Sequence, residues 1–185
     1  AAACPDEDKA DLIYRMIVLG LHLKDGHRIT GMLGNPVMQR MFELGRKAGN
    51  IAMRYIEIIR FQELDSGALL AVIDPEADVL ALIAPHFSNR LPLENWMIYD
   101  RRRQKAVIHP AGKGWFLVEE VDERSVLEAE MSHEEAWYGE MWKCFFKTLT
   151  IEARVNQKLQ TSLIPLKYRD FMKEFQNESL REDCE

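Results

Sequence analysis

The chain has 185 residues and a formal net charge of −6, with 47% hydrophobic and 29% charged residues, which is typical of a globular domain. No apolar run approaches the length of a transmembrane helix, and the acidic residues 6–11 differ from the basic start of a secretory signal. Three cysteines without close spacing favour neither a disulfide framework nor a zinc site. We therefore predict one domain over residues 1–185 in a reducing, cytoplasmic compartment, with no metal or other cofactor.

Two helices are predicted over residues 8–55. In the first, over 8–23, apolar residues recur at helical spacing and Gly26 follows the end. The second begins at Asn35-Pro36, because Asn favours the capping position and Pro favours the first turn. Its apolar face continues to Tyr55.

A sheet of about five strands is predicted over residues 57–121. Alternating residues on either side of the turn at 65–67 predict a hairpin. A short helix over 79–89 contains or follows Pro85. Three further strands then form an antiparallel meander. The predicted strands are 57–64, 68–73, 96–99, 105–109 and 115–121. The order of helices, strands and helices predicts an α+β domain with an antiparallel sheet.

Residues 132–175 are predicted to be helical. Ser132 and Glu135 form a capping box at the start of a long helix. Two adjacent rows of large apolar residues follow, and this pattern predicts a core helix that packs on the sheet. Cys144, beside these rows, is predicted to be a buried thiol. Pro165 prevents one continuous helix beyond it. The two rows are Trp137, Met141, Phe145 and Leu149, and Tyr138, Trp142 and Phe146.

Charge is segregated along the chain. Residues 119–140 hold nine acids and one base, whereas residues 143–173 hold seven bases and two acids, and residues 101–105 read RRRQK. An acidic protein binds phosphate backbone well only when its charges are segregated in this way. The pattern keeps a nucleic-acid interface open, although each cluster has the alternative of a solvated surface.

Three segments resemble an uncharacterised bacterial family that is associated with DNA metabolism and DNA repair. They are RFQEL at 60–64, APHFSNRLPLENWMIYDRRR at 84–103 and FFKTLTIEARVNQKLQTSLIPLKYRDF at 145–171. The family is typically encoded beside a radical-SAM protein assigned to DNA modification or repair, and a similar domain is sometimes fused to a uracil-DNA-glycosylase-like domain. Its members usually carry a further N-terminal segment, which we expect to be missing here. Val155 and Leu166 depart from the family pattern and remove two lysines.

The resemblance and the charges together define candidate site residues. If the second and third segments meet in space, their cations are suited to phosphate, their amides to base edges and their aromatics to stacking. Each has a structural alternative: Trp96 as a core residue, Asn95 as a turn cap, His86 as a helix cap and Arg154 as a partner of Asp100. The set comprises His86 as a catalyst, Phe87 and Trp96 as stacking residues, and Arg90, Asn95, Arg102, Arg154, Asn156, Lys158, Gln160 and Lys167 as phosphate- or nucleic-acid-binding residues.

Three functions remain open from the sequence. The first is an accessory protein of DNA repair or DNA metabolism that binds DNA or the radical-SAM partner. The second is a hydrolase or lyase that acts on DNA through His86, the one general acid or base in the set. The third is a protein-interaction module that uses the acidic 119–140 region. The nucleophile, zinc-protease and dinucleotide motifs of common enzymes do not occur. The sequence does not fix an oligomeric state.

Overall fold

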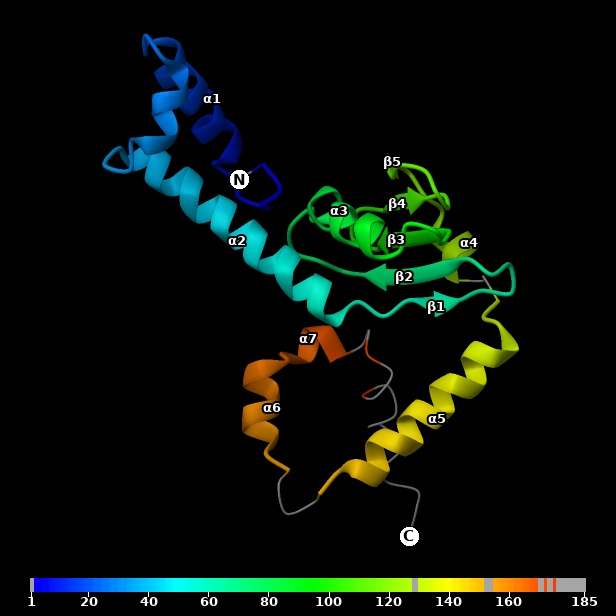
Figure 1. Ribbon diagram of the computed structural model, residues 1–185. Helices are drawn as coiled ribbons and strands as arrows, with labels where there is room; N and C mark the ends of the chain where they lie inside the picture. The colour runs from blue at the N-terminus through cyan, green and yellow to red at the C-terminus, as the bar shows by residue number, and fades with distance from the viewer. Residues whose placement is uncertain (1, 128–129, 152–154, 170–171, 173–174, 176–185) are drawn as a thin grey trace.

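The computed structural model describes residues 2–127, 130–151, 155–169, 172 and 175. Helices and strands succeed one another along the chain in a mixed α+β order (Figure 1). The elements are α1 (Lys9–Leu21), the 3-10 helix η1 (Gly26–Gly31), α2 (Pro36–Ile58), β1 (Gln62–Glu63), β2 (Leu69–Ile73), α3 (Leu80–Arg90), β3 (Trp96–Asp100), β4 (Lys105–His109), β5 (Phe116–Val118), α4 (Glu123–Leu127), α5 (His133–Leu149), α6 (Gln157–Leu163) and α7 (Leu166–Arg169).

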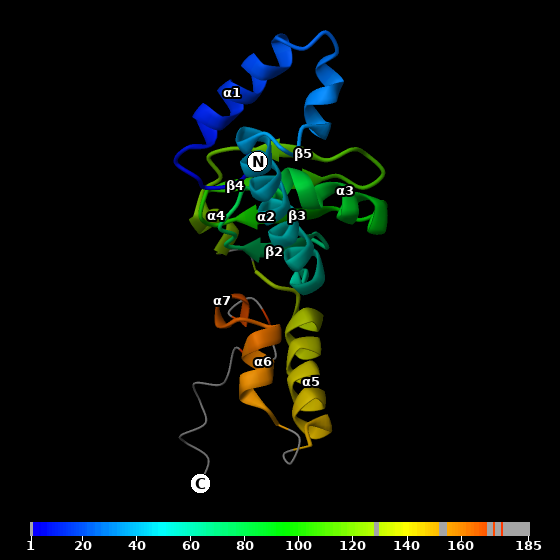
Figure 2. The ribbon, with the colours of Figure 1, turned by 90° about the vertical axis from the view of Figure 1, so that its left-hand side faces the viewer.

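The α1–α2 hairpin lies at one end of the molecule, the sheet in the middle, and α5 to α7 at the other end (Figures 1 and 2). The predicted cap of α2 is confirmed, since Asn35 Oδ1 accepts a hydrogen bond from the Val37 N–H at 2.9 Å. The helix extends to Ile58, so the predicted strand start at residue 57 is wrong. Tyr55 and Ile58 are buried there against the sheet, and this packing favours helix over the local alternation of residues.

The sheet has the order β1-β2-β3-β4-β5 and is antiparallel except between β2 and β3. That pair is parallel, with Leu69 opposite Trp96 and Ile73 opposite Asp100. The predicted α+β class, the hairpin and the antiparallel meander are confirmed, and the pair that joins hairpin and meander departs from the predicted antiparallel sheet. The reason is α3, which connects the two strands. A helical crossover returns the chain to the end of the sheet where β2 began, so β3 runs in the same direction.

The main core lies between the sheet, α3 and the C-terminal half of α2. Phe61, Phe87 and Trp96 meet there edge to face, with ring centroids 5.3 to 6.3 Å apart. His109 stacks on Trp96 at 4.9 Å, and its Nδ1 lies 3.1 Å from the Glu94 carbonyl oxygen. Phe87 and Trp96 are therefore buried core residues in this structure, and a core position was the sequence alternative for Trp96.

The long helix α5 projects away from the sheet (Figures 1 and 2). At its start, the Ser132 N–H donates to the Glu63 carbonyl at 2.9 Å, and Ser132 Oγ accepts from the Glu135 N–H at 3.0 Å, which confirms the cap. Beyond this attachment the large apolar side chains that the structure describes are exposed to solvent; the side chain of Phe146 lies outside that description. The prediction of a core helix is therefore wrong. The exposed residues are Trp137, Tyr138, Met141, Trp142, Phe145 and Leu149.

Candidate functional site

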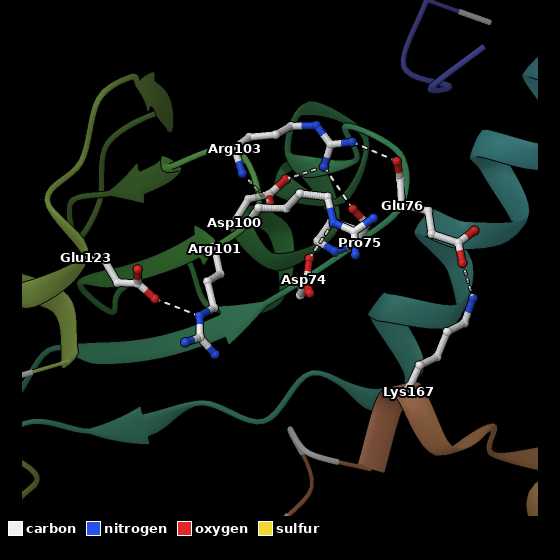
Figure 3. A network of polar contacts seen from close by, with 9 residues as sticks. Asp74, Pro75, Glu76, Asp100, Arg101, Arg103, Glu123 and Lys167 are labelled. Carbon is white, nitrogen blue, oxygen red and sulfur yellow. Dashed lines mark hydrogen bonds and ion pairs between the residues drawn. The ribbon is translucent and has the colours of Figure 1, made fainter.

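The three consecutive arginines at the β3–β4 turn are each paired with an acid. Arg101 Nε lies 2.6 Å from Glu123 Oε1, and Arg102 Nε lies 2.7 Å from Asp74 Oδ1. Figure 3 shows Arg101 and Arg103 reaching in different directions from the turn. This basic cluster therefore binds other parts of its own chain.

Arg103 holds the loop that follows β2. Its Nη1 donates to the Pro75 carbonyl and to Asp100 Oδ2, both at 2.9 Å, and its Nη2 donates to the Glu76 carbonyl at 2.7 Å (Figure 3). Asp100 is fully buried, and its other oxygen accepts from the backbone N–H groups of Arg102 and Arg103. Burial raises the pKa of Asp100, while the bonds from Arg103 oppose that shift. The result is a satisfied buried ion pair that fixes the 74–76 loop.

Two predicted binding residues, Arg102 and Lys167, lie beside this loop and line the same hollow. Lys167 Nζ on α7 lies 2.6 Å from Glu76 Oε1 (Figure 3), and this contact with Lys167 lowers the pKa of Glu76. Both cations line a small hollow of about 70 Å³, together with Ile51, Tyr55, Asp74, Glu76 and Tyr168. The structure therefore brings one arginine of the 101–105 cluster, Arg102, and one lysine of the basic C-terminal region, Lys167, to the same hollow, with a carboxylate beside each cation.

Other predicted residues have local structural roles. Asn95 Oδ1 accepts from the Ala111 N–H at 2.9 Å, and Asn156 Oδ1 caps α6 by accepting from the Leu159 N–H at 3.0 Å. The cap by Asn95 was the sequence alternative for that residue. Lys158 is exposed on α6, and Gln160 is half-buried one turn from the cap.

His86 and Arg90 are exposed on α3. The His86 ring contacts Phe87 edge to face at 5.1 Å. Among the described residues, no hydrogen bond or ion pair joins His86 to another side chain. Arg154 lies outside the described residues, so its predicted pairing with Asp100 stays a prediction.

The sequence reasoning missed a cavity on α5. It has a volume of about 450 Å³. Apolar and aromatic side chains dominate its lining, with Arg60 and Glu135 as the charged members. The one signal in the sequence was the width of the apolar surface, because two full rows of large residues exceed what one packed face of a helix needs. The cavity is lined by Arg60, Phe61, Glu135, Tyr138, Gly139, Met141, Trp142 and Phe145.

The described residues contain no group of three or more His, Cys, Asp or Glu side chains placed to hold a metal ion. Cys4 is buried and its thiol donates to the Leu44 carbonyl at 3.1 Å. Cys144 is exposed, so its prediction as a buried thiol is wrong, for the same reason as the apolar rows beside it. Within the part of the chain that the structure describes, no helix is both long and apolar enough to cross a bilayer.

Comparison with family models matches residues 7–174 to the family described as a domain of unknown function, DUF4130. The chain belongs to the DUF4130 family. No curated protein and no solved structure matches the chain significantly. The DUF4130 match includes the β3–β4 arginines, α5 and α7. Both the ion-pair network and the α5 cavity therefore lie within the family domain.

Proposed function

We propose that the protein is an accessory protein of DNA metabolism and repair that binds a partner protein through the aromatic face of α5. The resemblance of the 60–64, 84–103 and 145–171 segments supports the process. The observation that carries the binding mode is the exposed aromatic face, which consists of Trp137, Tyr138, Met141, Trp142 and Phe145.

Exposure of this kind has a free-energy cost that a partner would remove. Burial of apolar surface contributes roughly 25 cal/mol per Å², and contiguous exposed apolar patches mark interaction sites. Trp, Tyr, Phe and Met are the residues enriched at protein interfaces. Hot-spot residues also gather where a pocket can receive a side chain of the partner, and the 450 Å³ cavity beside Trp142 and Phe145 offers such a pocket.

The charge around this face indicates the chemistry of the partner. The acidic 119–140 region leads into α5, and Glu135 lines the cavity. A complementary surface would carry an apolar patch with Lys or Arg around it. The radical-SAM protein that the resemblance implies is the partner we propose. Under this proposal any iron–sulfur chemistry belongs to the partner.

The alternative of a DNA hydrolase that uses His86 has weaker support. A histidine that acts as a general base needs a ring nitrogen within hydrogen-bond reach of the proton it removes. Catalytic histidines usually also have a second group that orients the ring. His86 is exposed, and within the described part of the chain its side chain contacts the ring of Phe87. We therefore place the binding function on α5.

The test is a binding titration with a purified radical-SAM protein of the kind that the resemblance implies. Trp142→Glu and Phe145→Glu each place a charge on the face, whereas Leu93→Glu places the same charge on an exposed apolar residue in the loop after α3. We expect the α5 variants to bind at least about tenfold more weakly, which corresponds to about 1.4 kcal/mol. Leu93→Glu should bind like the unmodified protein. Equal affinity of all three variants would contradict the proposal.

A further inference from the structure

A second surface, separate from the aromatic face, lies along α2. Arg46, Asn50 and Arg54 recur every four residues and therefore project from one side of the helix. With Lys47 they line an open groove of about 410 Å³. Ile51, Glu76 and Tyr168 line both this groove and the small hollow that holds Arg102 and Lys167. The two hollows form one continuous surface between α2, the 74–76 loop and α7.

This surface concentrates positive charge in a chain of net charge −6. Five bases and three acids line the two hollows. Lys167, Lys47 and Arg102 all lower the pKa of Glu76, so their charges converge on one carboxylate. The bases are Arg46, Lys47, Arg54, Arg102 and Lys167, and the acids are Glu43, Asp74 and Glu76.

Part of this charge is available to a ligand. Among the described residues, Arg46 and Lys47 have no hydrogen bond or ion pair from their side chains, and both are exposed. The pairs Arg54–Glu57 at 3.1 Å, Arg102–Asp74 at 2.7 Å and Lys167–Glu76 at 2.6 Å are also solvent-accessible. Exposed pairs contribute about 0.2–1 kcal/mol each, so a phosphate can replace a carboxylate at small cost.

We propose that the groove along α2 binds the phosphate backbone of a nucleic-acid strand. From residue 43 to residue 54 the helix advances about 16 Å at 1.5 Å per residue. Phosphates of one strand follow one another every 3.4 Å or so along a duplex axis, so the groove spans several of them. Lys and Arg suit this ligand as point charges and bidentate donors.

The groove offers no base-stacking platform among its described residues. Its two tyrosines, Tyr55 and Tyr168, are buried and meet each other edge to face at 5.5 Å. Phosphate contacts without base contacts give affinity without sequence preference. Binding should therefore depend strongly on salt and weakly on sequence.

The test is fluorescence anisotropy of a labelled duplex oligonucleotide of mixed sequence, with the full chain as titrant. The double variant Arg46→Glu/Lys47→Glu reverses the two unpaired cations. Its control is Lys113→Glu, which reverses an exposed lysine in the turn between β4 and β5. We expect at least a tenfold loss for the double variant and a loss below about twofold for the control. Circular dichroism verifies that both variants are folded.

Two further measurements test the direction of the charge effect and the identity of the ligand. Glu76→Gln removes the carboxylate on which three cations converge, so it should tighten binding, and Glu140→Gln on α5 should not. Affinity for the duplex should fall about fortyfold between 50 and 200 mM salt if about three phosphates are neutralised. Equal losses in the double variant and Lys113→Glu would overturn the site. If inorganic phosphate displaced the oligonucleotide at an equal concentration of phosphate groups, the groove would be a site for free phosphate, and the proposal of a nucleic-acid strand as its ligand would be wrong.

Discussion

The molecule contains two aromatic clusters of similar composition and opposite environment. Phe87 and Trp96, in the cluster between α3 and the sheet, expose 5% and 1% of their surface. Trp137 and Phe145, on α5, expose 58% and 52%. The first cluster is covered because the α3 crossover places a helix over β3. The second lies on a helix that projects beyond β1 (Figure 1).

The two clusters show that an apolar stripe predicts which face of a helix will be covered, but not which surface covers it. Helical periodicity identifies the apolar face of α5, but the surface that would cover this face can come from the same chain or from another. In the core, edge-to-face contacts such as Phe61–Phe87 at 5.3 Å complete the packing internally. On α5 the apolar face borders a cavity. We interpret the first cluster as stabilising the fold and the second as binding a partner.

The largest effect that tests this comparison is on stability. Phe87→Ala should lower the free energy of unfolding by about 3–5 kcal/mol, because it leaves a cavity in the core. Phe145→Ala should change it by no more than about 0.5 kcal/mol, as is usual for an exposed position. Chemical denaturation followed by circular dichroism measures both. A cost of several kcal/mol for Phe145→Ala would mean that the α5 face is covered within the free protein.

The same contrast applies to the arginines. Arg103→Ala removes the partner of the fully buried Asp100, and the loss of one member of a buried pair should cost about 3 kcal/mol. Arg101→Ala removes an exposed pair with Glu123 and should cost less than about 1 kcal/mol. Denaturant unfolding of the two variants side by side provides the measurement. If Arg101→Ala proved the more costly, the clamp on the 74–76 loop would be wrongly assigned.

The smallest predicted effect concerns the contact between α7 and the loop after β2. Contact with Lys167 lowers the pKa of Glu76, so this pair stabilises the fold above the ordinary pKa of a glutamate and loses that effect as the pH falls through the folded-state pKa. The same contact raises the pKa of Lys167, so on the alkaline side the effect is lost as the pH rises through that raised value. Both groups are well exposed, which limits the contribution to less than about 1 kcal/mol.

Glu76→Gln should therefore be slightly less stable than the unmodified protein near neutral pH, and this difference should shrink in acid as the pH falls through the lowered folded-state pKa of Glu76. Unfolding titrations at neutral and acidic pH measure the difference. A gap that persists or widens at the acidic pH would assign the effect of Glu76 to something other than its charge.

The features that could be predicted from sequence are those fixed by local chemistry. Asn35 caps α2 because its side chain reaches a backbone N–H two residues away, and β4 occupies the predicted residues 105–109. The strand pairing was harder to predict from the sequence, because the parallel pair depends on where α3 returns the chain. The missed ion pairs are also non-local: Lys167 and Glu76 are 91 residues apart. No local pattern indicates that a basic cluster will meet carboxylates from such distant segments.

The most direct test of the central claim is the solvent accessibility of the α5 tryptophans. Acrylamide quenching of the unmodified protein should reveal a readily quenched fraction, and Trp137→Phe/Trp142→Phe should remove it, leaving emission from buried Trp96 and half-buried Trp115. Addition of the proposed radical-SAM partner to the unmodified protein should protect the same fraction. If the double variant instead removed quencher-resistant, blue-shifted emission, the α5 face would be covered by its own chain and the account would be contradicted.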